Sequence, residues 1–184
     1  MQYHCIGADK YKPYFSETPI VKPTLSQKEV EAGVSVVLSD NSHIKATNKE
    51  IIEIYMIDYS IPITKMMLEV GSEIVLNRKN TNSEQLWLFY NQVKSGGPWD
   101  IKLADRWAEM LPSINRYTVN FPFVFWGHVI NAENLGNITY GYWGALYEFS
   151  LELLLSGGDF AAGGKDSDED KFYIELGYLL YQYI

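Results

Sequence analysis

The chain has 184 residues, which suits one compact domain, or a domain of about 140 residues behind a looser leader. Apolar residues make up 47% of the chain and charged residues 21%, so it can build a packed core and is unlike a disordered protein. The formal net charge is −8, and residues 133–184 hold nine acids against two lysines. Because phosphate-binding proteins gather Lys and Arg on one face, this balance disfavours nucleic acid as a partner.

Three further features are disfavoured by the sequence: a membrane-spanning helix, a secretion signal, and a disulfide or a zinc site built on thiolates. The longest apolar runs, such as residues 121–126, are far shorter than the ~20 residues of a membrane-spanning helix. Residues 1–10 are polar where a secretion signal would be apolar, so we expect another carrier if the protein leaves its cell. Cys5 is the only cysteine, which excludes an intrachain disulfide and a zinc site built on several thiolates.

The first 46 residues differ from the rest in their residue pattern. Pro13, Pro19 and Pro23 interrupt regular structure there, so we expect a leader or linker over residues 1–46. Within it, residues 33–39 are rich in β-branched side chains and predict one short strand. The folded domain is then expected over residues 47–184.

Helical patterns follow from Thr47, which has capping-box spacing with Glu50. Pro62 predicts a break or a restart, after which an apolar stripe favours a helix that ends at Gly71. The clearest helix is expected from Thr81 up to the Ser-Gly-Gly-Pro stretch at residues 95–98, and a short helix around 104–111.

The C-terminal part begins with aromatic and β-branched residues at 117–130, interrupted by Pro122 and Gly127, which suggest an irregular hairpin. Three helices are then expected: residues 137–149, residues 151–155 capped by Ser150 and ended by the glycines at 157–158, and an apolar, buried helix over 168–183. The predicted fold class is mainly α within α+β, with a helical core, one short irregular hairpin and an extended N-terminal leader.

Two blocks of the sequence carry a family resemblance. Residues 95–102 read Ser-Gly-Gly-Pro-Trp-Asp-Ile-Lys, and residues 135–144 read Leu-Gly-Asn-Ile-Thr-Tyr-Gly-Tyr-Trp-Gly, followed by an acidic turn at 166–170. In that order they resemble the polymorphic toxin type 44 domain, over roughly residues 60–184. The family's acidic turn tends to read Asp-Asp-Pro-x-Asp, so only Asp166 and Asp170 match it here.

The resemblance implies an antibacterial effector of inter-bacterial competition, with residues 47–184 as its toxin domain. It further implies secretion or delivery into a target bacterium as part of a larger carrier, and neutralisation by a cognate immunity protein in the producing cell. The resemblance does not supply a mechanism, so catalytic candidates have to be judged from their chemistry.

The first block places a carboxylate, Asp100, two residues before the ammonium of Lys102. On an extended strand the two would share a face, and a carboxylate beside a cation stays ionised, as a nucleophile or a water-orienting base requires. Trp99 is a candidate for substrate binding. The alternative for this block is a surface ion pair beside a tryptophan that anchors the core.

The second block combines small residues with hydrogen-bonding ones. Asn137 could cap a helix whose amides hold an anion, and Tyr140 could donate a proton or a hydrogen bond. Gly136, Gly141 and Trp143 are candidates for substrate binding, since glycines let a ligand or another backbone come close. The alternative is close packing of helices with an asparagine cap.

Three more candidates complete the set. His128 could act as a base oriented by Asp100 or Asp170, although a structural histidine among aromatic residues is the common case. Asp166 and Asp170 could be catalytic carboxylates, or could merely solvate a loop and a helix start. No cofactor and no metal site is required by the sequence, although a divalent cation at Asp166 and Asp170 is compatible with it.

Three functions compete on this basis. The leading hypothesis is a hydrolase of the cell envelope, acting on peptidoglycan or its lipid-linked precursor in the target's periplasm rather than its cytoplasm, with two carboxylates as acid and base. The second is a nuclease that uses His128, Asp100, Lys102 and Tyr140, and it requires a basic cleft from Lys94, Lys102 and Arg106. The third is a binding module without enzymatic activity. The enzymatic proposals require the segments around residues 100, 137 and 170 to converge on one cleft.

Overall fold

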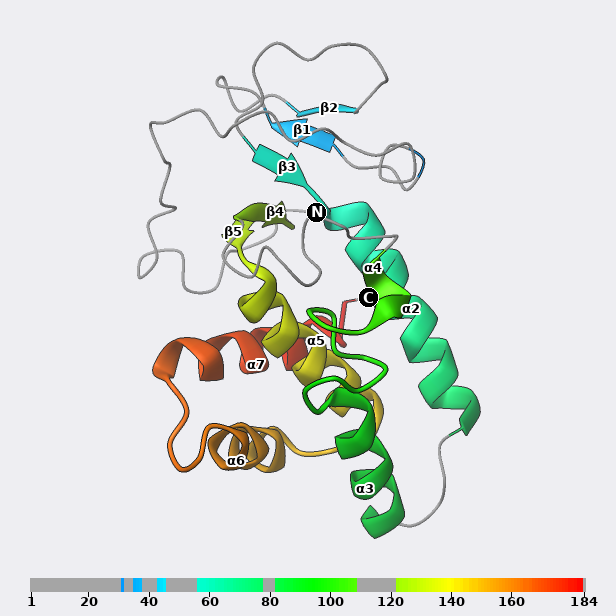
Figure 1. Cartoon of the computed structure of the whole chain (residues 1–184), viewed down its shortest axis with the longest axis vertical. Coiled ribbons are helices and arrows are strands. Elements are labelled where there is room, and N and C mark those ends of the chain that lie inside the picture. The colour runs from blue at the N-terminus through cyan, green and yellow to red at the C-terminus, as the bar shows by residue number, and fades with distance from the viewer. Residues whose placement is uncertain are drawn as a thin grey trace.

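The computed structural model describes residues 31, 35–37, 43–45, 56–77, 82–108 and 122–183. In Figure 1 a small sheet caps one end of the molecule, and the helices form a cluster below it, with α5 (Ala132–Leu146) in the middle. The helix expected from Thr47 to Tyr55 lies outside the described residues. None of the described helices has the length and apolar character needed to cross a membrane.

Five short strands form one sheet in the order β2-β1-β3-β4-β5. β1 (Ser35–Val37) pairs antiparallel with β2 (His43–Lys45) and with β3 (Met56–Asp58), and β3 is parallel to β4 (Phe123–Phe125). β1 confirms the strand predicted at residues 33–39. The sheet therefore joins strands of the predicted leader to strands of the predicted toxin domain.

The predicted irregular hairpin is confirmed by β4 and β5 (His128–Ile130), which pair antiparallel. Its turn consists of Trp126 and Gly127, both with positive φ (50° and 79°), which is the arrangement of a type I′ turn. The left-handed backbone of a tryptophan is strained, and two hydrogen bonds hold it: its amide to Ser60 Oγ (2.8 Å) and its indole N–H to Thr64 Oγ1 (3.0 Å).

The N-terminal helices follow the predicted stripes but differ at their ends. α2 (Ser60–Asn77) carries Pro62 in its first turn, where proline is tolerated, so the restart predicted there is correct. The predicted stop at Gly71 is wrong, because the helix continues for six residues and Gly71 admits the side chain of Leu146. α3 (Asn82–Val93) confirms the clearest predicted helix, and α4 (Asp105–Ala108) confirms the described part of the short one.

The C-terminal helices require three corrections. α5 begins five residues earlier than predicted, because the side chain of Asn131 caps it and Asn134 completes a capping box, so Asn137 is not the cap. α6 (Leu151–Ala161) has the predicted cap at Ser150 but continues through the glycines at 157–158. α7 (Asp168–Leu180) buries only the stripe of Tyr173, Ile174 and Gly177, so it is not buried all round as predicted.

The crossing of α5 and α7 organises the core, and glycines make it unusually close. A Cβ atom on Gly141 would lie 2.1 Å from the Ile174 carbonyl oxygen, and one on Gly177 would lie 1.9 Å from the Ile138 carbonyl oxygen. The two backbones therefore touch where side chains would normally separate them. Other faces of α5 contact α2, through Trp143 Nε1 and the Met67 carbonyl (3.3 Å), and α3.

Candidate functional site

Asn137, in the second sequence block, meets the acidic turn at residues 166–170 at the start of α7. Asn137 on α5 donates a hydrogen bond from Nδ2 to Asp170 Oδ1 (2.6 Å), and Ser167, which caps α7, donates from Oγ to Asp170 Oδ2 (2.6 Å). The Asp170 amide donates back to Ser167 Oγ (3.0 Å). Both carboxylate oxygens of Asp170 therefore accept hydrogen bonds, and the side chain is held in one orientation.

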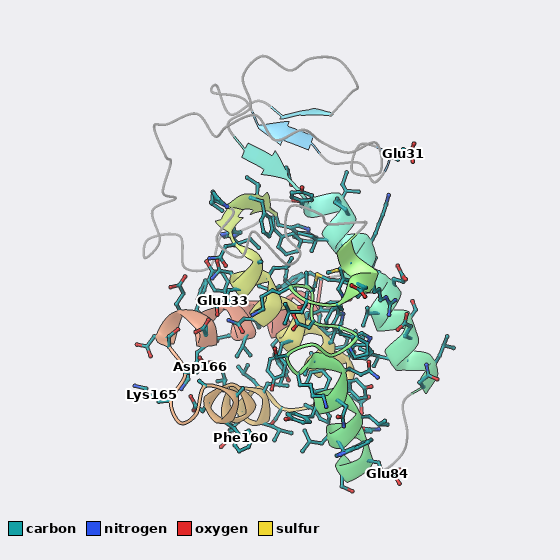
Figure 2. All side chains as sticks on the ribbon, in the orientation of Figure 1. Glu31, Glu84, Glu133, Phe160, Lys165 and Asp166 are labelled. Carbon is teal, nitrogen blue, oxygen red and sulfur yellow. The ribbon has the colours of Figure 1, made fainter. Side chains whose placement is uncertain are left out.

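Asp166 completes a carboxylate pair with Asp170. Figure 2 places it in the connection between α6 and α7, where a carboxylate oxygen faces the space above Gly158. Burial raises the pKa of Asp166, and the negative charge of Asp170 and a hydrogen bond with that carboxyl raise it further. The nearby negative charge of Asp170 disfavours ionisation of Asp166, so Asp166 keeps its proton to a higher pH than an isolated aspartate does.

An ion pair beside these carboxyls anchors the connection. Asp159 Oδ1 accepts from the Asp166 amide (2.8 Å) and lies 2.7 Å from Lys171 Nζ. The hydrogen bond from Lys171 is the main reason that the pKa of Asp159 is lowered. Asp159, Ser167 and Lys171 were not among the site residues predicted from the sequence. Ser167 could have been found as a cap before an acidic first turn, whereas nothing in the sequence links Asp159 to Asp166.

Tyr140 follows Asn137 by three residues on α5, and its hydroxyl makes a different contact. Its hydroxyl donates to the Leu154 carbonyl (3.1 Å) and lies over Gly157 of α6, where a Cβ atom would be 2.4 Å away. Burial raises the pKa of Tyr140 to about 12, so the phenol stays protonated at neutral pH.

The three glycines of the block differ in the space around them. Gly136 faces open space, with nothing within 4 Å of the point where a Cβ atom would lie, so a ligand can approach there. The space beside Gly141 is filled by the α7 backbone, and that beside Gly144 by Leu154. These contacts support the packing alternative for Gly141 and leave Gly136 accessible.

The first block lies on a different face of α5. Trp99 packs against Trp143 (centroids 5.5 Å apart) and Tyr147 (6.4 Å). Asp100 is buried in a turn rather than on a strand, and its carboxylate accepts from the amides of Gly96 (2.8 Å) and Lys102 (3.0 Å). These hydrogen bonds close the turn that follows α3, and closing a turn is a common role of aspartate.

His128 is exposed at the start of β5, opposite Phe125. No hydrogen bond from it to Asp100 or Asp170 is recorded among the residues that the structure describes. Of the predicted catalytic residues, the structure thus brings Asn137, Asp166 and Asp170 together. It places Asp100, Lys102 and His128 elsewhere, so the expected convergence of three segments is reduced to two.

The sequence left open a divalent cation at Asp166 and Asp170. Within the described ranges, no group of three His, Cys, Asp or Glu residues is arranged to hold a metal ion. Asn137 and Ser167 each donate one hydrogen bond to Asp170, one to each carboxylate oxygen. The arrangement is therefore suited to acid and base chemistry.

Comparisons with known proteins bear on the whole of this region. A family model described as bacterial toxin 44 matches residues 88–182, more than half of the chain. The matched range contains both sequence blocks, the acidic turn and the carboxylate pair, and it confirms the resemblance read from the sequence. No curated protein and no solved structure matches the chain.

Proposed function

Because the chain belongs to the bacterial toxin 44 family, we propose that it is an antibacterial effector domain that hydrolyses a component of the target's cell envelope, peptidoglycan or its lipid-linked precursor. Delivery as part of a larger secreted or injected carrier, and neutralisation by a cognate immunity protein, belong to this proposal. Residues 47–184 would form the toxin domain.

The observation that supports hydrolysis is the closeness of Asp166 to Asp170, where burial and the negative charge of Asp170 raise the pKa of Asp166. Asp170, oriented by Asn137 and Ser167, would accept a proton from water as the hydroxide adds to a carbonyl carbon. Asp166, whose pKa is raised, would donate its proton to the leaving group. Two aspartates that share one proton are a known solution to amide hydrolysis, because one acts as acid while the other acts as base.

The same contact argues against a glycosidase. Carboxyls that cleave glycosidic bonds lie about 5 Å apart in retaining enzymes and further apart in inverting ones, so that a sugar or a water fits between them. Asp170 lies close enough to Asp166 for its charge to raise the pKa of Asp166. Amide bonds of the peptide part of the envelope are therefore the substrate that the pair suits best.

Two of the three basic residues that the nuclease alternative requires make contacts within the protein. Arg106 donates to Glu69 (2.9 Å) and to both carboxylate oxygens of Glu73, one of them at 3.0 Å, so its charge is neutralised within the protein. Lys94 hydrogen-bonds to Asn91 (2.8 Å) and lies over the ring of Tyr90. Neither side chain is oriented by its contacts toward a phosphate site.

Expression in a susceptible bacterium tests the proposal, with one form confined to the cytoplasm and one exported to the periplasm. We expect killing from the periplasm, and its loss in Asp166→Asn and in Asp170→Asn. Asp168→Asn is the matched control, because this exposed aspartate of the same turn makes no hydrogen bond recorded in the described part of the chain.

Each outcome decides between the alternatives. Killing only from the cytoplasm would contradict envelope hydrolysis. Undiminished killing by both variants of the pair would contradict the enzymatic role and support a binding module. Release of free amino or carboxyl groups from purified peptidoglycan, measured for the parent and Asp170→Asn proteins, would identify amide cleavage directly.

A further inference from the structure

The connection between α6 and α7 (Figure 1), which carries Asp166, is held against the last turn of α6. Gly163 and Gly164 both have positive φ (78° and 153°), so the chain turns back at residues where a side chain would be strained. The Gly164 amide donates to the Asp159 carbonyl (2.9 Å), and the Asp166 amide donates to Asp159 Oδ1 (2.8 Å). Asp159 therefore holds the connection at two points, once with its backbone and once with its side chain.

The side chain of Asp159 is itself held by Lys171. Lys171 Nζ lies 2.7 Å from the same oxygen, Asp159 Oδ1, and Lys171 directly follows Asp170 on α7. The side chains of Asp159 and Lys171 are 34% and 26% exposed, and ion pairs of this kind contribute little to the free energy of unfolding. What the pair provides is a fixed place for Asp159 Oδ1, and through it for the backbone of Asp166.

The carboxyl of Asp166 occupies room that a glycine provides. Gly158 directly precedes Asp159, and a Cβ atom there would lie 2.8 Å from Asp166 Oδ2 and 3.0 Å from Cδ1 of Ile174. A side chain at position 158 would therefore displace the carboxyl. The position of Asp166 thus depends on two adjacent residues of α6, neither of which belongs to the carboxylate pair.

We propose that Asp159, held by Lys171, is a positioning residue of the candidate site, because its hydrogen bond with the Asp166 amide keeps the Asp166 carboxyl beside Asp170. The catalytic part of this inference rests on the proposed hydrolysis, whereas the positioning is a property of the folded protein. An acid acts only within hydrogen-bond reach of the group that it protonates, and a small misplacement is costly. Without this bond, Asp166 would be free to move with its glycine-rich connection.

Two substitutions of Asp159 test the proposal, because both remove its charge but only one removes the acceptor. Asparagine keeps an oxygen that accepts from the Asp166 amide, whereas leucine, of similar size, has none. Nuclear magnetic resonance measures how fast the Asp166 amide proton exchanges with water. We expect exchange to be about tenfold faster in Asp159→Leu than in Asp159→Asn, as the loss of one hydrogen bond implies. Amide cleavage in peptidoglycan should fall about tenfold in Asp159→Leu and be largely retained in Asp159→Asn.

A second pair of variants leaves Asp159 in place and keeps the test decisive if Asp159→Leu does not fold. Lys171→Met removes the ammonium that holds Asp159 and should show faster exchange of the Asp166 amide, whereas Lys171→Arg keeps a cation and should resemble the parent. Lys165→Met is the matched control, because it removes a positive charge from the same connection and leaves the pair of Asp159 and Lys171 intact.

The outcomes separate this inference from the proposed hydrolysis. Equal exchange in Asp159→Leu, Asp159→Asn and the parent would overturn the positioning role, and so would parent-like cleavage by Asp159→Leu while Asp170→Asn is inactive. Equal loss in both Asp159 variants would overturn it too, since the charge and not the acceptor would then be responsible. Undiminished killing by Asp170→Asn, together with fast exchange in Asp159→Leu, would contradict the hydrolysis and still support the positioning of Asp166.

Discussion

Asp166 links the chemistry of the candidate site to the stability of the protein. Its pKa is raised by burial and by Asp170, so the folded protein binds this proton more tightly than the unfolded chain does. The resulting stability is complete below the ordinary pKa of an aspartate and is lost as the pH rises through the raised pKa. The same side chain that could supply a proton in hydrolysis therefore reduces stability once it ionises.

We expect Asp166→Asn to remove this dependence on pH, because an amide does not titrate. The parent's free energy of unfolding should fall, relative to that of the variant, as the pH rises from the acidic range toward neutrality. Urea unfolding at a series of pH values measures both curves, and Asp168→Asn should follow the parent. A variant that kept the parent's slope would show that Asp166 is not the titrating group.

Tyr140 is expected to act through packing rather than chemistry. Its hydroxyl donates to the Leu154 carbonyl, and burial raises its pKa to about 12. Tyr140→Phe should reduce the free energy of unfolding by about 1 kcal/mol, the usual net contribution of one hydrogen bond, and killing should persist. Denaturant unfolding and the killing assay check both parts, with Tyr183→Phe as the exposed control. Lost killing at full stability would instead assign a catalytic role to the hydroxyl.

At the scale of elements, the crossing of α5 and α7 depends on two glycines. An alanine at Gly141 or Gly177 would place its Cβ within about 2 Å of a backbone oxygen of the other helix. A backbone cannot give way as a flexible side chain can, so the helices would have to move apart. We expect each substitution to destabilise the protein by roughly 2–3 kcal/mol, as overpacking does.

Gly136→Ala is the control for this prediction, because the same helix has open space there. An alanine in a helix is favoured over a glycine by about 0.5–1 kcal/mol, so this variant should be slightly more stable than the parent. Thermal or denaturant unfolding of the three variants compares them directly. Equal effects at Gly136 and Gly141 would mean that helix propensity, not the close crossing, sets the cost.

At the scale of the whole molecule, the helical core and the sheet depend on different parts of the chain. The buried residues of the main core, in the part of the chain that the structure describes, extend from Tyr59 to Ile174. β1 and β2 lie before residue 47; β1 pairs with the edge of β3, and β2 pairs with β1. A chain that begins at residue 47 should therefore keep the core while it loses two strands.

We expect such a shortened chain to unfold cooperatively, to keep its helical circular dichroism and to kill when exported to the periplasm. The exposed edge of β3 should make it more prone to association, which size-exclusion chromatography would detect. A shortened chain that lacks a cooperative transition would show instead that residues 1–46 are part of the toxin fold.

Local patterns determined much of this protein. Periodicity and backbone preference act over a few residues, so they can be read from the sequence. They account for the apolar stripe of α3, the serine cap of α6, the β-branched run of β1 and the turn residue Gly127. The ordered sequence blocks were also sufficient to identify the family that the family model confirms. Helix ends were less predictable, since Gly71 and the glycines of α6 are retained for packing against neighbouring helices.

Only the tertiary structure decided which polar residues meet. Asn137 and Asp170 come together because glycines let α5 and α7 cross closely. Asp100, in contrast, accepts hydrogen bonds from the amides of its own turn. The Asp166 amide likewise meets Asp159 only because the connection returns to the last turn of α6. The spacing of residues in the sequence specifies which of them share a face of one element. Contacts between elements depend on how several faces pack together, and no single segment encodes this packing.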